Sequence, residues 1–256
     1  QMNKPSVYVG MPCYGAIQRE TVVSLLKLFD QFKATGIKAQ FNTIQSPLVT
    51  HARNLVTCGY LHSKCDYLLF IDADVQFEPE SVYRMLIAKK DVICTPYRLK
   101  TVEDPTKSKY PVRFEDKEDI KLLPGDLVEI EQGPAGLMLI NRRVFLKLMV
   151  SHPELKITFP KETRQVMNME VLGDPTTKED PVKELMYNFW DTTFSLKTGE
   201  WRGEDLSFCH LVKRNGFQIF ANTVSITGHY GTYGWKGKFK DNIKPSNGED
   251  IEYFND

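Results

Sequence analysis

Two aspartates stand close together at the end of an apolar run in the first half of the chain. The run Tyr67–Ile71 has the length of a buried strand, and Asp72, Ala73 and Asp74 follow it directly. Burying a charge is costly unless it is paired or bound to a cation, so we expect the carboxylates at the exit of the strand. Such oxygen ligands suit a hard divalent cation that also holds a phosphate. The alternative is a pair of acidic residues that caps the next turn.

Strands and helices alternate around these aspartates. Residues 6–11, 38–44, 67–71 and 91–95 read as strands, and apolar residues at helical spacing predict helices over about 22–35, 50–63 and from Pro79 onward. Gly36 is expected to end the first helix. Its apolar face is expected to consist of Val22, Leu25, Leu26, Phe29 and Phe32. This alternation predicts an α/β fold with a mostly parallel central sheet and helices on both faces.

Ligands of such sheets bind at the carboxyl ends of the strands. Here the strand ends are Pro12–Tyr14, the segment before Ser46, Asp72–Asp74 and Pro96–Tyr97. Because parallel strands end at one edge, we expect these four segments to lie together there.

The second half is less regular. Short strands are expected near 110–114 and 127–131, a turn at Gly133–Gly136, an apolar run over 137–140, a helix over 141–150, a loop or lid over 151–185, a helix over 204–215 and a strand over 217–221. We predict a single domain over residues 1–234, built from a half at 5–100 and a smaller β and loop half at 101–234. Residues 235–256 read as a tail.

The composition does not point to a nucleic acid or a membrane. Among 256 residues, 33 Lys and Arg balance 33 Asp and Glu, so no net positive field attracts phosphate backbones. No run approaches the ~20 apolar residues of a membrane span. The cysteines are few, scattered and odd in number, which favours reduced thiols. We therefore expect a cytoplasmic protein.

Four further features could carry chemistry. Glu204 and Asp205 begin a predicted helix, where acidic residues can act as a base or merely cap the helix. His229 lies in a Gly- and Tyr-rich segment and is either a metal ligand or an ordinary histidine. Arg53 can reach a phosphate or be a solvated helix charge. The cluster Tyr187–Asp191 is either a stacking platform for an acceptor or a hydrophobic anchor.

Taken together, these residues resemble a nucleotide-sugar-dependent glycosyltransferase of the GT-A fold. The set is most similar to that of small glycosyltransferase-like proteins of phages and large DNA viruses, which is consistent with a virus-encoded protein acting in the host cytoplasm. The resemblance spans residues 6 to about 233 and rests on ordered elements: Met11–Gly15, Ala52–Asn54, Phe70–Asp74, Gly133–Gly136, Arg202–Asp205 and Thr227–Tyr230.

The resemblance implies roles for these residues. A Mn²⁺ or Mg²⁺ ion would be held by Asp72, Asp74 and His229. A UDP- or GDP-linked sugar donor would contact Pro12, Cys13, Tyr14, Arg53, Asp72, Ala73 and Gly136. Asp205 would take the proton of the acceptor hydroxyl, with Glu204 as its neighbour at the acceptor site. Direct displacement would invert the anomeric carbon, although related folds also host retaining enzymes.

The acceptor stays open at this point: a glycan, a glycoprotein or another hydroxyl compound would serve. Two other functions compete. A nucleotidyltransferase would make the nucleotide-sugar, but such enzymes carry a basic Gly-rich loop after the first strand, and Pro12–Gln18 holds no basic residue. A non-catalytic nucleotide- or carbohydrate-binding module is the other alternative.

Overall fold

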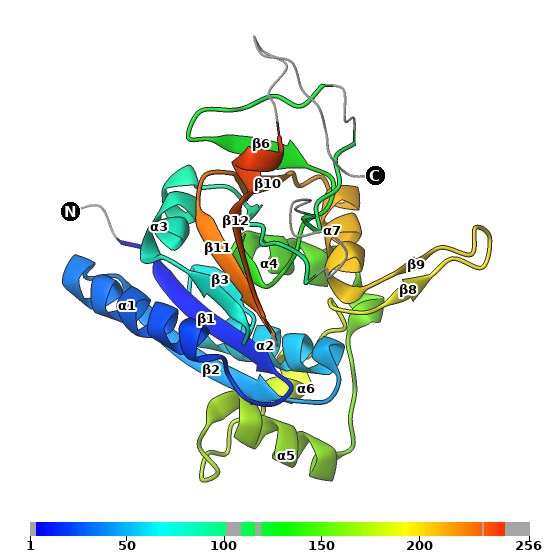
Figure 1. Cartoon of the computed structure of the whole chain (residues 1–256). Coiled ribbons are helices and arrows are strands. Elements are labelled where there is room, and N and C mark those ends of the chain that lie inside the picture. The colour runs from blue at the N-terminus through cyan, green and yellow to red at the C-terminus, as the bar shows by residue number, and fades with distance from the viewer. Residues whose placement is uncertain (1–3, 101–108, 116–118, 232, 244–256) are drawn as a thin grey trace.

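The structure, a computed structural model, describes residues 4–100, 109–115, 119–231 and 233–243 (Figure 1). Its strands are β1 Ser6–Cys13, β2 Lys38–Gln45, β3 Tyr67–Ile71, β4 Val75–Phe77, β5 Val92–Cys94, β6 Leu127–Ile130, β7 Leu137–Asn141, β8 Thr193–Phe194, β9 Trp201–Arg202, β10 Ile219–Asn222, β11 Ile226–Tyr230 and β12 Gly234–Lys238. Its helices are α1 Arg19–Thr35, α2 Val49–Ser63, α3 Pro79–Ala88, α4 Arg142–Ser151, α5 Lys161–Leu172, α6 Pro181–Leu185 and α7 Glu204–Arg214, with 3₁₀ turns at Pro153–Leu155 and Phe239–Asn242.

A seven-stranded central sheet has the order β2-β1-β3-β7-β5-β10-β6. Five strands run in one direction, and β7 and β6 run against them. The expected α/β class with a mostly parallel sheet is therefore confirmed. The antiparallel β7, which lies between β3 and β5, was not predicted. The chain leaves β1 toward β2 and then returns past β1 to β3, so the strand order reverses there. Sheets of this kind bind ligands at such a reversal.

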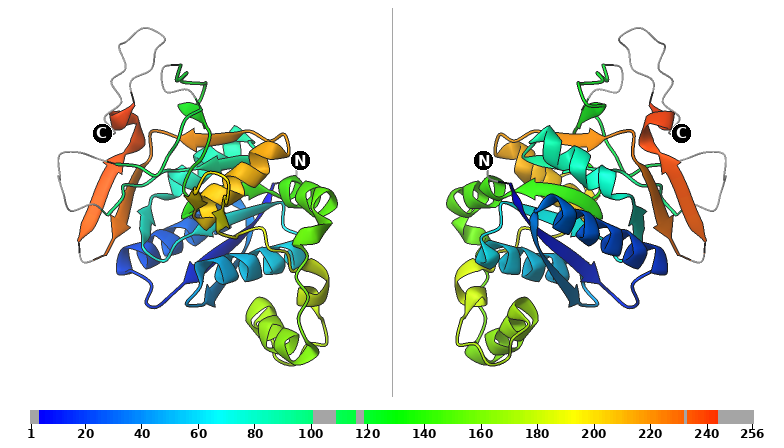
Figure 2. Two further views of the ribbon diagram at one scale, coloured as in Figure 1. Left: turned by 90° about the vertical axis from the view of Figure 1, so that its right-hand side faces the viewer. Right: turned by 90° about the vertical axis from the view of Figure 1, so that its left-hand side faces the viewer.

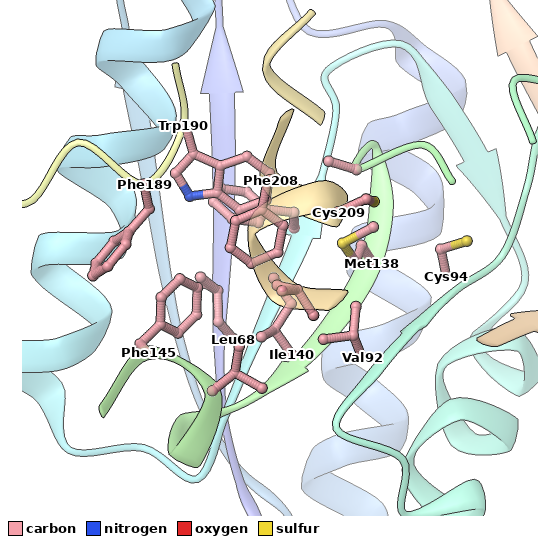
Figure 3. Packing of buried hydrophobic residues seen from close by; sticks show 14 of the residues in the cluster. Leu68, Val92, Cys94, Met138, Ile140, Phe145, Phe189, Trp190, Phe208 and Cys209 are labelled. Atoms are coloured by element: carbon pink, nitrogen blue, oxygen red, sulfur yellow. The ribbon is translucent and has the colours of Figure 1, made fainter. Parts of the chain in front are cut away.

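Side chains alternate between the two faces of the sheet and form two cores. In β3, Leu68 and Phe70 pack with residues of α2, α4 and α7, whereas Leu69 and Ile71 pack with α1 and α3. This is the period of two that a doubly covered strand requires. Figure 3 shows part of the first core, with Trp190 stacked on Phe208 at 4.0 Å between ring centroids. Helices thus cover both faces (Figures 1 and 2).

Several local predictions are confirmed. Gly36 ends α1 in the left-handed conformation, Pro79 opens α3, and α2 and β3 have nearly the expected bounds. The core face of α1 was predicted only in part. Leu25 is buried, but Val22 and Leu26 are exposed, and Leu28 takes their place in the core.

Two segments differ from expectation. Residues 151–185 are not a loop, because α5 and α6 lie there. α5 packs against α2 and β2, with Asn42 Nδ2 donating to the Val171 carbonyl at 3.1 Å. The predicted tail is also wrong for its first residues: β12 pairs with β11, and Phe239 and Ile243 are buried. Residues 244–256 lie outside the described part of the chain.

A second sheet, β12-β11-β4, stands against the end of β3. It matters for the site because β4 begins directly after Asp74, and β11 carries His229. All five cysteines are buried and none forms a disulfide. Across the described ranges, the helices are too short or too polar to cross a bilayer.

Candidate active site

A cavity of about 590 Å³ opens at the carboxyl ends of β1, β2 and β3. This volume is in the range of small-molecule sites. Three of the four predicted strand ends meet in its wall, which confirms that they share one edge. The lining residues are Pro12, Cys13, Tyr14, Gly15, Ala16, Gln18, Ser46, Pro47, Val49, Ala52, Asp72, Ala73, Asp74, Lys100, Tyr230 and Gly231. We call this space the donor cavity.

The pairing of β11 with β4 brings His229 to Asp74. His229 lies opposite Val75 in this register, and the Tyr230 amide donates to the Asp74 carbonyl at 2.9 Å. His229 Nε2 then lies 3.5 Å from Asp74 Oδ2. The second ring nitrogen, Nδ1, is 2.8 Å from the Arg98 carbonyl, which can only accept a hydrogen bond, so Nδ1 carries a proton.

Asp74 also meets an ammonium group that sequence reasoning missed. Lys100 Nζ is 2.5 Å from Asp74 Oδ2. Burial alone would raise the pKa of Asp74, but the hydrogen bonds from His229 and Lys100 outweigh it and lower the pKa. Asp74 therefore stays ionised in a partly buried position. No local pattern around Lys100 signals this contact, because only the tertiary structure brings it there.

Asp72 faces a different partner. Arg53 Nη2 lies 3.0 and 3.2 Å from the two Asp72 oxygens, and Arg53 Nε lies 3.3 Å from Glu204 Oε1. The guanidinium is only 2% exposed and lies over the rings of Phe70 and Trp190. Burial disfavours the charged form of Arg53, but attraction to the carboxylates of Asp72 and Glu204 outweighs burial and raises the pKa of Arg53. Arg53 is therefore a buried link between Asp72 and Glu204, not a solvated helix charge.

Burial raises the pKa of two carboxyl groups of this cluster, Asp72 and Asp205, above the ordinary aspartate value. Burial, followed by the nearby Glu204 carboxylate, raises the pKa of Asp205 to about 6, and Arg53 offsets only part of this. One oxygen accepts a hydrogen bond from the Leu206 amide at 2.8 Å, which belongs to the first turn of α7. A carboxyl group of this kind can accept and release a proton near neutral pH.

Gly136 allows Tyr97 and Asp72 to approach each other. A Cβ at position 136 would lie 2.4 Å from Tyr97 Oη and 2.5 Å from Asp72 Oδ2, closer than any side chain tolerates. Tyr97 is buried, and its ring lies 4.7 Å from that of His229. Tyr97 was predicted only as part of a strand end. Its position just after β5, at the ligand-binding edge, was the available signal.

The residues at the end of β1 line the donor cavity. Tyr14 is 79% exposed there, free to contact a planar ligand. Pro12 and Cys13 are the last residues of β1, and the Cys13 thiol donates to the Gly15 carbonyl. The Ala73 carbonyl accepts a hydrogen bond from the Gln18 amide at 2.8 Å, and this bond holds the start of α1 next to the segment Asp72–Asp74.

The aromatic cluster before the acidic pair is not a platform. Trp190 is fully buried, Phe189 is 2% exposed and Tyr187 is 9% exposed. The Trp190 indole donates to Thr57 Oγ1 at 3.0 Å, and its ring stacks on Phe208 (Figure 3). The acceptor-platform interpretation is wrong for these residues, and the hydrophobic anchor is correct.

The described residues include no group of three or more His, Cys, Asp or Glu side chains arranged to hold a metal ion by themselves. Asp74 and His229 lie together, while Asp72 is turned to Arg53. A cation here would therefore take its remaining ligands from a bound molecule. Mg²⁺ and similar ions commonly do so when they bind with a phosphate.

Comparison with known proteins gives matches only among solved structures. No protein-family model and no curated protein sequence matches the chain. A197 from STIV superposes with a TM-score of 0.46 at 19% identity, over 88% of this chain and 86% of that one. GalNAc-T7 with UDP, GalNAc and Mn²⁺ gives 0.43 at 12% identity, over 90% of this chain and 44% of that one.

A glycosyltransferase involved in glycosylation of the major capsid of PBCV-1 gives a TM-score of 0.32 at 11% identity, over 63% of this chain and 74% of that one. Likenesses at these values do not indicate an activity. The geometry of the site has to carry the functional conclusion.

Proposed function

We propose that the protein is a glycosyltransferase that binds a nucleoside-diphosphate sugar in the donor cavity and transfers the sugar to an acceptor hydroxyl. One observation carries this proposal: Asp74 and Asp205, which flank the two carboxylates joined by Arg53, have opposite electrostatic environments. Hydrogen bonds from His229 and Lys100 lower the pKa of Asp74, whereas burial raises that of Asp205 to about 6. A pair of carboxyl groups whose pKa values are pushed apart commonly divides the work of charge stabilisation and proton transfer.

The residues around Asp74 fit a divalent cation. Because His229 Nδ1 donates to a carbonyl, Nε2 is the nitrogen that faces the Asp74 carboxylate at 3.5 Å, and a divalent cation bound between them would take the place of the Nε2 proton. Asp74 and His229 would hold Mn²⁺ or Mg²⁺, and the imidazole ligand suits Mn²⁺ better. When bound, the cation supplies charge neutralisation for the diphosphate that leaves.

The chain's own residues would perform the other steps. Tyr14 would contact the nucleoside, and the Lys100 ammonium would face the diphosphate from the cavity wall. The acceptor oxygen attacks the anomeric carbon, the bond from that carbon to the phosphate oxygen breaks, and its electron pair goes to the diphosphate. Asp205 receives the acceptor's proton. Arg53 holds Asp72 and Glu204 in place between the donor and acceptor sides.

The test is a panel of UDP- and GDP-sugars, each with and without Mn²⁺, read by thermal stabilisation and by release of free NDP. A ligand at a hundred times its Kd adds about 2.7 kcal/mol of stability, or roughly 5–10 °C in Tm for a chain of this size. Asp74→Ala should remove the metal-dependent part of the shift, whereas Asp30→Ala, an exposed site on α1, should not. If no NDP-sugar raises the Tm, the proposal is wrong.

A parallel assay with a nucleoside triphosphate, a sugar phosphate and Mn²⁺ tests the competing nucleotidyltransferase. That enzyme would release pyrophosphate from a nucleoside triphosphate and a sugar phosphate. Pyrophosphate release without NDP release would replace the glycosyltransferase proposal with this one.

A further inference from the structure

The hairpin of β8 and β9 carries two aromatic rings toward solvent. Phe194 is 59% exposed and Trp201 is 64% exposed. They are direct partners in the antiparallel register, so both side chains lie on one face of the hairpin. The hairpin projects from the body beside the N-terminus of α7 (Figure 1), and of its two strand pairs the one formed by Phe194 and Trp201 is nearer the connecting turn.

The opposite face of the hairpin makes the contacts with the body. Thr193 Oγ1 lies 2.9 Å from Ser207 Oγ, and the Ser207 hydroxyl also reaches the Arg202 carbonyl at 3.3 Å. Arg202 forms an ion pair with Glu200 on this face. The usual arrangement of a strand, apolar inward and polar outward, is therefore inverted here. Large exposed aromatic side chains gathered in one place commonly mark a binding surface.

This aromatic face adjoins the proposed base. Gly203 separates Trp201 from the start of α7, and a Cβ built there would lie 4.0 Å from the Trp201 ring atom Cη2 and 3.6 Å from Asp205 Oδ1. The indole and the carboxylate thus both lie within 4.0 Å of one built Cβ position. Trp190, one of the two candidates for an acceptor platform, is buried, whereas Trp201 beside the acidic pair is exposed.

We infer that Phe194 and Trp201 form the acceptor platform, and that the acceptor is a carbohydrate whose pyranose ring stacks on the indole with one hydroxyl directed at Asp205. This inference rests on the proposed function. The flat face of an aromatic ring is electron-rich and matches the C–H face of a sugar ring. The hydroxyls of the same sugar require polar neighbours, and the Asp205 carboxyl group lies beside the Trp201 ring, since both come within 4.0 Å of a Cβ built at Gly203.

The first experiment is binding to an array of oligosaccharides that end in glucose, galactose, mannose, N-acetylglucosamine, xylose, fucose or rhamnose. Binding is measured with NDP and Mn²⁺ present, and Kd values of positive glycans are then determined by calorimetry. Trp201→Ala should weaken glycan binding at least tenfold, and Phe194→Ala about threefold or more. Trp201→Phe, which keeps a ring, should recover most of the affinity.

Leu196→Ala is the matched control. Leu196 is 94% exposed near the tip of the same hairpin, so this variant removes apolar surface without removing a ring. It should bind glycans like the wild type. Because all three side chains are exposed, the variants should melt at the wild-type temperature.

Three outcomes would overturn the inference: wild-type glycan affinity in Trp201→Ala, no glycan bound by the wild type, or a dimer that Trp201→Ala dissociates in sedimentation. The last would make the aromatic face an interface between copies of the chain. Binding of NDP in the same samples tests the donor cavity separately. Glycan binding without NDP binding would refute the proposed function but not the glycan-binding platform. NDP binding without glycan binding would refute the platform but not the proposed donor site.

Discussion

Replacing Asp205 with asparagine should stop sugar transfer and stabilise the fold at pH 8. Burial raises the pKa of Asp205 to about 6, against an ordinary value of 3.8. That difference corresponds to a free-energy cost on the order of 3 kcal/mol for holding the ionised group in the fold. Asparagine has nearly the same shape and carries no charge, so it avoids this cost.

The pH dependence follows from the sign of the pKa difference. The folded chain binds the Asp205 proton more tightly than the unfolded chain does, so this group lowers stability as pH rises from about 4 to about 6, and the loss is complete above about 7. Asp205→Asn should therefore exceed the wild type by about 1–3 kcal/mol at pH 8, or several degrees in Tm, and by much less at pH 5.

Urea unfolding at pH 5 and pH 8 measures the difference in unfolding free energy between Asp205→Asn and the wild type. Asp30→Asn, on the exposed side of α1, is the control and should have the wild-type stability at both pH values. NDP release in the presence of an acceptor measures transfer. Loss of a general base lowers turnover about 10²–10⁴-fold, and wild-type activity should rise through pH 6 as Asp205 loses its proton. An equal stability gap at both pH values, or near-normal turnover in Asp205→Asn, would refute the reasoning.

Three further predictions concern the donor side. Arg53→Met should cost about 3–5 kcal/mol in urea unfolding, because it leaves two carboxylates without their buried partner; a wild-type midpoint would show that the ion pairs contribute nothing. Gly136→Ala should lower the Tm, since its Cβ would meet Tyr97 Oη at 2.4 Å, whereas Gly15→Ala enters open space and should not; equal Tm values for the two variants would contradict the packing argument. Tyr14→Ala should weaken NDP binding about 3- to 10-fold by calorimetry without changing the Tm, as expected for ~1 kcal/mol of ring stacking, and unchanged affinity would remove Tyr14 from the donor site.

Local patterns in the chain were sufficient to predict the parallel part of the sheet and its ligand edge. β2, α2 and β3 have nearly the predicted bounds, because alternating and helical spacings of apolar residues report directly on which face of an element is buried. Asp72 and Asp74 were placed at the exit of β3 for the same reason: carboxylates cannot continue a buried apolar strand without a partner.

Contacts between segments far apart in the chain decided the remaining strand order and the position of His229. β7 enters the sheet between β3 and β5, and β11 pairs with β4, which brings His229 to Asp74. Strand pairings of this kind depend on partners far away in the chain, so no local spacing reveals them.

Trp190 and Trp201, which both precede Asp205 in the chain, show most clearly what tertiary packing decides. Both are aromatic residues close to the same acidic pair, and the sequence pattern left the cluster around Trp190 open between an exposed platform and a hydrophobic anchor. Packing against Phe208 and Arg53 buries Trp190, while the hairpin holds Trp201 in solvent. Residue type and spacing therefore determined which chemistry the chain contains, and tertiary packing determined which side chains can reach a ligand, because exposure depends on what folds against each residue.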